Sequence, residues 1–525
     1  MAKEAASAEA VANVPGLRHT VWDQDQQLPK YPRIAKDESA DVVVVGAGIA
    51  GMNVAYNLIK EGMSVILLEG RTRGSGQTGR TTAHIMPWND DFYYMLEQQH
   101  GAQVVKHVAE SHRSAIEWVA NTVQEEKLDC HFKRLDGYLF PCNESSTEHD
   151  KLQKEFEACK KFGFDNVELV DLGGDPSVGK IHKALRFPDA AEFHPLMYIN
   201  GLAEAFVRRG GKIYEMSRVM EIDGGSQVKT ADGVSVSTGA VVVATNSPLN
   251  HDVLVHARQA ASHSYVVGLK VPKGSVRTAE WWDTDSPYHY VRLEEKDGYD
   301  VLIVGGGDTS TGMKPSEYKD TYGELANWAR ARWTSAQEVL YTWTGQVFEP
   351  ADKLHLIGLE PLESLKGSNQ YIVTGDSGQG MTGGTIAGIL IRDLILGRPN
   401  PWAAVYSPKR LLPLDVSTIK SAVEEANHTF QGLKDTIPFL GTDSVDIEDL
   451  QTSHGAVIQT GLHKVAVYKD GNGRVHRHSA VCPHMKCIVK WNPVDSTFDC
   501  PCHGSIFDPY GKVINGPAKA DLFEI

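Results

Sequence analysis

A glycine-rich turn between two apolar segments constrains the fold of this 525-residue chain more than any other feature. Val42–Val45 is a continuous β-branched run, and Gly46–Gly51 (GAGIAG) follows it directly. An apolar segment typical of a helix comes next, and a second predicted strand ends at Glu69. A strand that is buried on both faces, then a glycine turn and a helix, begins a parallel α/β unit. The sequence therefore predicts a Rossmann-like dinucleotide-binding domain.

Each residue type in this motif has a physical task. Gly46 permits the tight turn, Gly48 lets the backbone approach a pyrophosphate, and Gly51 allows close packing of helix on strand. The helix N-terminus offers free N–H groups and a positive dipole to the phosphates. Glu69 would accept hydrogen bonds from the hydroxyls of the adenosine ribose. A sheet that uses its glycines for packing alone is the alternative, and the full strand–turn–helix–strand–acid pattern disfavours it.

The composition excludes several classes of protein. Hydrophobic residues make up 41% of the chain and charged residues 23%, as in ordinary globular proteins. The 52 Lys and Arg against 67 Asp and Glu give a net charge of −15, which argues against nucleic-acid binding. No apolar run is long enough to span a membrane, and the opening segment MAKEAASAEAVANV lacks the pattern of a secretory signal. We therefore expect a cytoplasmic protein, compatible with a homo-oligomer.

The chain divides into four regions by composition. Residues 1–40 form a polar N-terminal extension, and a mixed α/β region follows over 41–398. Residues 399–444 begin with four prolines, as is typical of a linker, and continue with a short helical pattern over 416–433. From residue 445 to 525, short strands alternate with glycine turns, which predicts a small all-β domain.

Four of the seven cysteines fall within this last region. Cys482 and His484 give C-x-H, and Cys500 and His503 give C-x-x-H fifteen residues further on. Two thiolates and two imidazoles, delivered as pairs by two short loops, are the ligands of a Rieske [2Fe–2S] cluster. A zinc ion also accepts two Cys and two His. The remaining cysteines, Cys130, Cys142 and Cys159, are scattered and are interpreted as ordinary thiols.

The residues around these loops resemble Rieske proteins. The resemblance implies Cys482, His484, Cys500 and His503 as ligands, a disulfide between Cys487 and Cys502, and a Ser505 hydroxyl that donates to a bridging sulfide. It also implies that Gly516-Pro517-Ala518 covers the cluster. Phe507 stands where respiratory Rieske proteins carry a tyrosine whose hydroxyl donates to a ligand sulfur, so we expect a lower reduction potential. Zinc or a structural disulfide knot remains the alternative.

Four segments of the α/β region resemble the D-amino-acid oxidase and glycine oxidase superfamily, near γ-glutamylputrescine oxidase-like proteins. They are the loop 71–84, the segment that begins at His194-Pro195 and passes Val219, the strand 241–246 and the glycine-rich segment 371–397. The resemblance implies an α/β FAD-binding domain (about 41–90, 190–250 and 345–398) with an antiparallel α+β substrate domain (about 91–189 and 251–344). It implies non-covalent FAD, because Arg80 stands where some members carry a histidine that is linked to the flavin.

The predicted FAD-binding residues combine the glycine motif with these four segments. They are Gly46, Gly48, Ile49, Ala50, Gly51, Glu69, Gly70, Arg71, Thr78, Gly79, Arg80, Thr81, Thr82, Val219, Ala244, Thr245, Gly375, Asp376, Gly380, Met381 and Thr382. A second glycine cluster at 301–312 places Ser310 where a third glycine would belong, and no helical pattern follows it. We interpret that cluster as a substrate-domain strand.

The resemblance also indicates where a substrate would lie. His289, Tyr290 and Arg292 share a predicted strand, and in related enzymes an arginine of this region binds a substrate carboxylate through two hydrogen bonds. Tyr341, Trp343 and Gln346 belong to a segment that borders the flavin, and His84 and Trp88 follow the flavin loop. Of these, His289, Tyr290, Arg292 and Trp343 are the predicted catalytic residues. A surface-facing strand or simple aromatic packing would explain the same residues without a catalytic role.

These observations together predict an FAD-dependent oxidoreductase that oxidises a C–N bond of an amine or amino acid to an imine. Electrons would pass from FAD to the Rieske cluster and on to an external acceptor, which is a protein, a quinone or oxygen. One alternative is an electron-transfer flavoprotein fed by NAD(P)H or a reductase, although no second nucleotide motif supports it. Another is a redox sensor or assembly factor. The sequence identifies neither the amine nor the acceptor.

Overall fold

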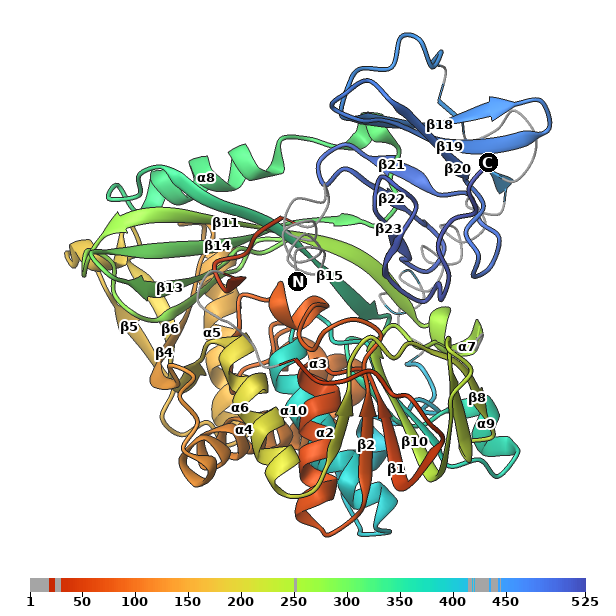
Figure 1. Cartoon of the computed structure of the whole chain (residues 1–525). Helices are drawn as coiled ribbons and strands as arrows, with labels where there is room; N and C mark the ends of the chain where they lie inside the picture. The colour runs from red at the N-terminus through yellow and green to blue at the C-terminus, as the bar shows by residue number, and fades with distance from the viewer. Residues whose placement is uncertain are drawn as a thin grey trace.

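The computed structural model describes residues 18–23, 30–249, 253–413 and 445–525, with the isolated residues 418, 420, 434, 435, 442 and 443. Figure 1 shows an α/β layer, a long antiparallel sheet above it, and a small all-β domain seated beside that sheet. The helix predicted over 416–433 falls almost wholly outside the described residues.

The α/β layer is built on a mainly parallel sheet with the order β16-β17-β10-β1-β2-β7. Its strands are β1 (Glu38–Val45), β2 (Val65–Leu68), β7 (Lys212–Tyr214), β10 (Ser235–Asn246), β16 (Leu356–Leu359) and β17 (Gln370–Thr374), with β8 (Val219–Asp223) and β9 (Gln227–Thr230) attached to β10. β1 pairs in parallel with both β10 and β2, and its Val42–Val45 segment is fully buried or nearly so. These buried parallel strands confirm the predicted Rossmann-like unit.

Helices cover one face of this sheet (Figure 1). They are α2 (Ile49–Lys60), α4 (Ala102–Glu126), α6 (Pro195–Arg208) and α10 (Gly380–Ile395). α10 lies directly on α2, because Gly384 and Gly388 have no side chain at the contact. A Cβ atom at Gly388 would lie 2.8 Å from Cβ of Asn53, so only glycine permits this spacing.

The antiparallel sheet has the order β15-β11-β14-β13-β12-β4-β6-β3, with β5 paired to β6. Its strands are β3 (His84–Ile85), β4 (Lys133–Phe140), β5 (Glu168–Asp171), β6 (Lys183–Glu192), β11 (Gln259–Pro272), β12 (Glu280–Asp283), β13 (Tyr290–Lys296), β14 (Tyr299–Ser310) and β15 (Val339–Pro350). The helices α5 (Ser146–Lys161), α7 (Val253–His256) and α8 (Thr321–Arg332) contact this sheet, and α3 (Tyr93–His100) packs on α4 and α5. Two short helices belong to the α/β layer: α9 (Pro361–Leu365) connects β16 to β17, and α11 (Trp402–Val405) packs on α4 and α10.

The second glycine cluster lies on β14 of this antiparallel sheet. A Cβ atom at Gly305 would lie 2.0 Å from the ring of Tyr290, which crosses the strand at that point. The glycine therefore makes room for an aromatic ring.

The C-terminal domain consists of two small antiparallel sheets. One contains β18 (His454–Thr460), β19 (His463–Lys469) and β20 (Val475–Ser479), and the other β21 (Lys490–Asn492), β22 (Thr497–Asp499), β23 (Ile506–Phe507) and β24 (Val513–Asn515). A separate hydrophobic core holds them together, with Trp491, Phe498 and Phe507 at its centre. This domain has the small all-β architecture that the sequence predicts.

Part of the predicted polar N-terminal extension is buried. Val21 and Trp22 have no exposed surface, and the Trp22 indole N–H donates to the Thr81 carbonyl oxygen at 2.7 Å. Arg18 donates to the carbonyl oxygen of Val494 in the C-terminal domain. The segment thus packs where the flavin loop, the antiparallel sheet and the C-terminal domain meet, which its polar composition did not indicate.

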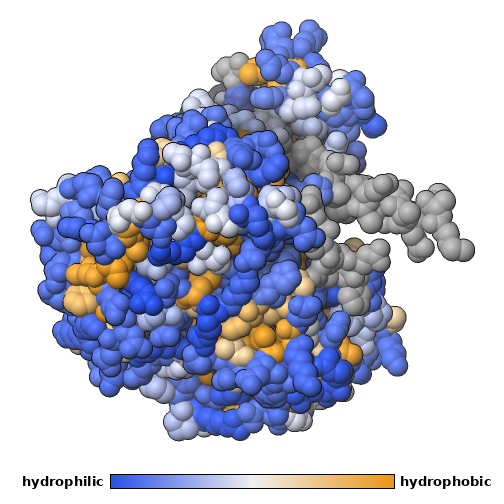
Figure 2. Space-filling view, turned by 90° about the vertical axis from the view of Figure 1, so that its left-hand side faces the viewer, coloured by the Kyte–Doolittle hydropathy of each residue, from blue (hydrophilic) through white to orange (hydrophobic). Residues whose placement is uncertain are grey.

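The part of the chain that the structure describes holds no helix long and apolar enough to cross a membrane. The face of the molecule drawn in Figure 2 is mainly hydrophilic, with small apolar patches between polar side chains.

Candidate active site and cluster site

A cavity of about 870 Å³ opens at the carboxyl ends of β1, β10 and β17, where ligands of parallel α/β sheets bind. All of the predicted FAD-binding residues line it except Gly51, Gly79 and Gly375. They are Gly46, Gly48, Ile49, Ala50, Glu69, Gly70, Arg71, Thr78, Arg80, Thr81, Thr82, Val219, Ala244, Thr245, Asp376, Gly380, Met381 and Thr382. Segments far apart in the chain therefore converge on one continuous space.

The glycine motif has the geometry of a nucleotide cradle. Gly46 has φ +102°, and a Cβ atom there would lie 2.5 Å from the Ala244 carbonyl oxygen. A Cβ atom at Gly51 would lie 1.8 Å from the Gly46 carbonyl oxygen, so Gly51 is required for helix packing rather than for lining the cavity. The Glu69 carboxylate accepts the backbone N–H groups of Ala47 and Arg71 at 2.8 Å each, which fixes it at the cavity wall.

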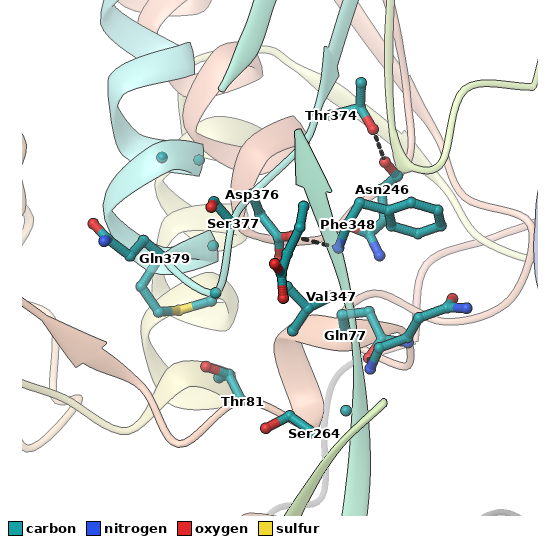
Figure 3. A pocket seen from close by; sticks show the side chains of 18 of the residues that line it. Gln77, Thr81, Asn246, Ser264, Val347, Phe348, Thr374, Asp376, Ser377 and Gln379 are labelled. Carbon is teal, nitrogen blue, oxygen red and sulfur yellow. Dashed lines mark hydrogen bonds between the residues drawn. The ribbon is translucent and has the colours of Figure 1, made fainter. Parts of the chain in front are cut away.

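Another part of the cavity wall is rich in carboxyl groups. Asp90 accepts hydrogen bonds from the Tyr288 hydroxyl and the Gln379 amide. Asp308 accepts one from the Ser264 hydroxyl, which also lies 2.7 Å from the Tyr290 hydroxyl. Figure 3 shows part of this wall, where Asp376 accepts the backbone N–H of Phe348 beside Gln379 and Ser377.

Burial changes the acidity of these groups. It raises the pKa of Asp90 to about 7, with a further contribution from the charge of Asp91. It raises the pKa of Asp308 and of Asp376 to about 6 each. His84, which also lines the cavity, has its pKa lowered to about 3 by burial and by the charge of Arg292, so it is neutral at pH 7. Carboxyl groups that titrate near neutrality in a cavity are suited to accept and hold protons.

Of the predicted catalytic residues, Tyr290 alone lines the cavity. The His289 ring turns away, stacks on Trp328 at 4.2 Å between ring centres and bonds to Asp283. His289 directly precedes β13, and its contacts with Asp283 and Trp328 hold its ring away from the cavity. Trp343 lies under the flavin loop, where its indole N–H donates to the Arg80 carbonyl oxygen at 2.8 Å.

Arg292 is buried inside the protein and not at the cavity wall. Its guanidinium lies 3.2 Å from Glu192 and 3.1 Å from Glu294, and it also donates to the carbonyl oxygens of Thr82, Ala83 and Phe193. These contacts hold the guanidinium between the flavin loop and two carboxyl groups of the sheet. Arg292 therefore braces the flavin loop against the antiparallel sheet.

The other residues that were predicted at the flavin border lie partly at the cavity wall and partly in the core. Gln346 and His84 line the cavity. Trp88 is buried beside it and donates to Glu155 at 2.6 Å, and Tyr341 is buried in the adjoining core. Asp90 and Tyr288 were not predicted, because no motif surrounds them and only the fold brings them together. Asp308 belongs to the glycine cluster at 301–312, which was interpreted as a substrate-domain strand with no residue assigned to a site.

A second site lies in the C-terminal domain. Cys482 and His484 belong to a turn closed by hydrogen bonds between Cys482 and Cys487, and Cys500 and His503 to a turn closed by hydrogen bonds to Ser505 and Gly504. Cys487 and Cys502 form a disulfide that joins the two turns. The Ser505 hydroxyl oxygen accepts the N–H of Ala518 at 3.0 Å, which holds the 516–518 segment beside the turns.

The donor atoms fit a two-iron cluster better than a single metal ion. Cys482 and Cys500 are buried free thiols, and the rings of His484 and His503 lie 5.1 Å apart. No three of these four side chains, all of them described, bring donor atoms within 4.8 Å of one another. Two thiolates on one iron and two imidazoles on another satisfy this spacing. A zinc ion would need all four donor atoms at about 2.0–2.3 Å from the metal, and therefore close to one another.

The sequence model of the family described as "FAD dependent oxidoreductase" matches residues 41–394, and that of the "Rieske [2Fe-2S] domain" matches residues 443–525. The chain belongs to the FAD dependent oxidoreductase family. It carries a C-terminal Rieske domain, and its cofactors are FAD and a [2Fe–2S] cluster. These matches confirm the resemblance, the fold class and the cofactors that the sequence predicted.

The chain is similar to known proteins over both parts. YhfW of Bacillus subtilis, whose name describes a Rieske 2Fe-2S iron-sulfur protein, is 29% identical over 96% of this chain and 97% of its own length. γ-Glutamylputrescine oxidoreductase of Escherichia coli is 23% identical over 68% of this chain and 84% of its own length. The crystal structure of glycine oxidase from Geobacillus kaustophilus covers 71% of this chain and 100% of its own, with TM-score 0.60 and 19% identity.

The two sites of this flavoprotein adjoin each other. Val513, Ile514, Asn515, Gly516, Ala518 and Lys519 of the Rieske domain line the same cavity as the FAD-binding residues. The Lys519 ammonium donates to the Met220 carbonyl oxygen at 2.9 Å, and Arg218 donates to the Lys519 carbonyl oxygen. The segment that was expected to cover the cluster therefore also forms part of the wall of the FAD cavity.

Proposed function

We propose that this oxidoreductase oxidises a C–N bond of an amine or amino acid to an imine, which water then hydrolyses. The electrons leave through the Rieske cluster to an external acceptor. Bound FAD supplies the hydride acceptor, and the cluster carries one electron at a time. A relative that acts on γ-glutamylputrescine by its name, and a solved structure of a glycine oxidase with the same fold, support this chemistry.

The observation that carries the proposal is the cavity shared by the two domains. The FAD-binding glycines and the 513–519 segment of the Rieske domain line one space. Such an arrangement supports electron transfer within the chain rather than through a separate carrier.

The carboxyl groups of the cavity wall support an amine as the substrate. Oxidation of a C–N bond requires the neutral amine, so the ammonium proton must leave first. Asp90, with a pKa of about 7, is placed to take that proton near neutral pH, and its bonds to Tyr288 and Gln379 orient it. Asp308, bonded to Ser264, adds negative charge that attracts a cationic amine.

The proposal is tested with anaerobic protein and a panel of amines and amino acids, added singly and followed by absorbance. Bleaching of the flavin, with a carbonyl product and ammonia or an amine in equal amounts, supports it. Reduction by NADH or NADPH and by no amine or amino acid in the panel would replace it with the reductase function.

A further inference from the structure

Gln346 of β15 connects the wall of the FAD cavity to a cluster-binding turn. Its backbone N–H donates to the side-chain oxygen of Gln77, in the flavin loop, at 2.6 Å. Its side-chain N–H donates to the Gly504 carbonyl oxygen, in the Rieske domain, at 2.7 Å. The side chain is only 3% exposed. Both ends of this residue are therefore fixed, one at each cofactor site.

The turn that holds Cys500 and His503 packs closely against β15. Gly504 directly follows the ligand His503 and has φ +76°. A Cβ atom at Gly504 would lie 2.6 Å from Cβ of Ala261 and 2.7 Å from the Gln346 amide nitrogen. A larger residue would push the turn away from the flavoprotein domain.

The imidazole side of the cluster site also faces the flavoprotein domain. The ring of His256, at the end of α7, lies 5.2 Å from the His484 ring and 5.0 Å from the His503 ring, measured between ring centres. His484 and His503 are both at least nine-tenths buried. Electrons that enter from the flavin side would therefore meet the histidine-bound iron first.

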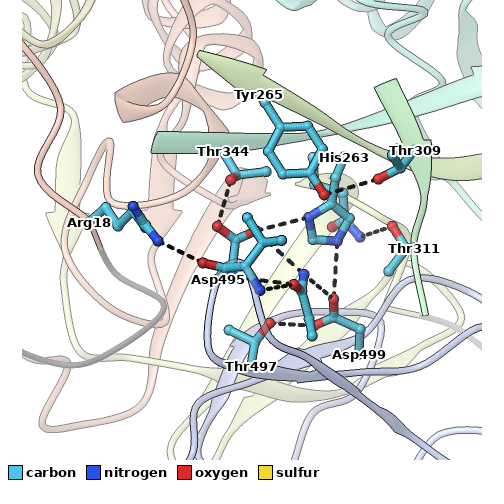
Figure 4. A network of polar contacts seen from close by, with 12 residues as sticks. Arg18, His263, Tyr265, Thr309, Thr311, Thr344, Asp495, Thr497 and Asp499 are labelled. Atoms are coloured by element: carbon cyan, nitrogen blue, oxygen red, sulfur yellow. Dashed lines mark hydrogen bonds and ion pairs between the residues drawn. The ribbon is translucent and has the colours of Figure 1, made fainter. Parts of the chain in front are cut away.

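A second polar network, centred on His263, also holds the two domains together. It reaches Asp499, which directly precedes the ligand Cys500, and Asp495, five residues before that ligand. His263 of β11 lies between Asp495 and Asp499 of the Rieske domain, and Thr344 donates to Asp495 at 2.7 Å (Figure 4). These contacts anchor the Rieske domain without touching Gly504. The role of Gln346 can thus be tested separately from docking as such.

We propose that Gln346 is a positioning residue for electron transfer from FAD to the Rieske cluster. It holds the turn that carries His503 against the strand that borders the flavin. The inference rests on the proposed direction of electron flow. Each oxidised substrate delivers two electrons to the flavin, and the cluster passes them on singly, so a one-electron acceptor must reoxidise the cluster twice.

The test uses the variants Gln346→Leu and Gln346→Glu in the full-length holoprotein. The flavin is reduced photochemically with deazaflavin and EDTA, so no substrate need be known. The measured quantity is the rate at which the electron appears on the cluster, followed by absorbance and by the EPR signal of the reduced cluster. Because small displacements of reacting groups have large kinetic effects, we expect transfer to slow by about tenfold or more.

Thr344→Val is the matched control, since it removes an interdomain hydrogen bond that does not reach the ligand turn. We expect its transfer rate to stay close to that of the unmodified protein, and the cluster potential and EPR spectrum to be unchanged in Thr344→Val and Gln346→Leu, neither of which adds a charge. If Gln346→Leu loses a cofactor, Gln346→Glu decides, because it keeps the side-chain length and replaces the N–H donor with an acceptor oxygen that cannot bond to the Gly504 carbonyl. Unchanged rates in the Gln346 variants, or equal slowing in Thr344→Val, would overturn the inference.

The same experiment separates this inference from the proposed function. If no amine reduces the flavin but photochemical transfer depends on Gln346, the positioning role stands and the substrate proposal fails. If amines reduce the flavin and the Gln346 variants transfer electrons at the normal rate, the substrate proposal stands and the positioning role fails.

Discussion

The imidazole of His263 lies 3.4 Å from the carboxylate of Asp495, across the interface between the two domains. Both side chains are buried, and Asp499 lies at the same distance on the other side of the ring. A buried cation between two carboxylates fixes the docking of the Rieske domain only while the imidazole carries its proton. This arrangement makes domain docking sensitive to pH.

Docking is expected to weaken as the pH rises above neutrality. Burial alone would lower the pKa of His263, but its close contact with Asp495 and the charges of Asp499 and Asp495 raise it above the ordinary value. A raised pKa gives stability that is complete below the ordinary histidine value of about 6.5 and is lost as the pH rises through the raised pKa. Thermal unfolding of the protein at pH 6 and pH 9 measures this loss.

The variant His263→Leu removes the cation and leaves two buried carboxylates without it. We expect the free energy of unfolding to fall by about 3–5 kcal/mol at pH 6, the usual cost of breaking a buried ion pair. The free energy of unfolding of this variant would then not decline between pH 6 and pH 9. Equal stability of the unmodified protein at pH 6 and pH 9 would contradict this account.

Asp90 is expected to control the pH dependence of amine oxidation. Burial raises its pKa to about 7, so the proton-accepting carboxylate forms as the pH rises through that value. For Asp90→Asn we expect kcat/KM to fall about 10²-fold. We also expect the rise of kcat/KM with pH near pH 7 to disappear. Asp285→Asn is the control, because Asp285 lines the same cavity but is exposed at its rim. A limb near pH 7 that persists in Asp90→Asn would argue against this role.

Gly51→Ala is expected to abolish FAD binding although Gly51 does not line the cavity. The added Cβ would overlap the Gly46 carbonyl oxygen at 1.8 Å and force α2 away from β1. Flavin content after purification measures the effect. Gly471→Ala serves as the control, since the nearest atom to a Cβ there is 3.8 Å away. Retention of full flavin content in Gly51→Ala would show that the helix can shift without loss of the site.

Phe507→Tyr is expected to raise the reduction potential of the cluster. Phe507 is fully buried in the core that surrounds the cluster turns. A hydroxyl that donates to a ligand sulfur stabilises the reduced cluster. Redox titration followed by EPR gives the potential of each protein. An unchanged or lower potential in Phe507→Tyr would mean that the missing hydroxyl does not set the value.

The features whose geometry follows from sequence spacing are local ones. The glycine motif and the C-x-H and C-x-x-H pairs place their residues within single turns, so spacing alone determines their geometry. Asp90 and Tyr288 are 198 residues apart, and nothing near either one indicates that they meet. His289 and Tyr290 are adjacent in the sequence, but only Tyr290 lies on β13 and lines the cavity. His289 precedes the strand and stacks on Trp328, a contact that only the tertiary structure creates.

No sequence pattern predicts the interface between the two domains. Gln346 could be assigned to the flavin border by resemblance, but its bond to Gly504 requires the relative placement of two separately folded units. The burial of Trp22 within a polar segment has the same origin. Contacts of this kind follow from tertiary structure alone.

The most direct test of the central claim is an anaerobic titration of the as-purified protein with an amine that bleaches the flavin, followed by absorbance and EPR together. The account predicts that the flavin is reduced first and that the EPR signal of the reduced Rieske cluster then grows at its expense. A cluster that stays oxidised while the flavin remains reduced would contradict electron transfer from FAD to the cluster. The absence of any Rieske signal even with dithionite would contradict the assignment of the cluster itself.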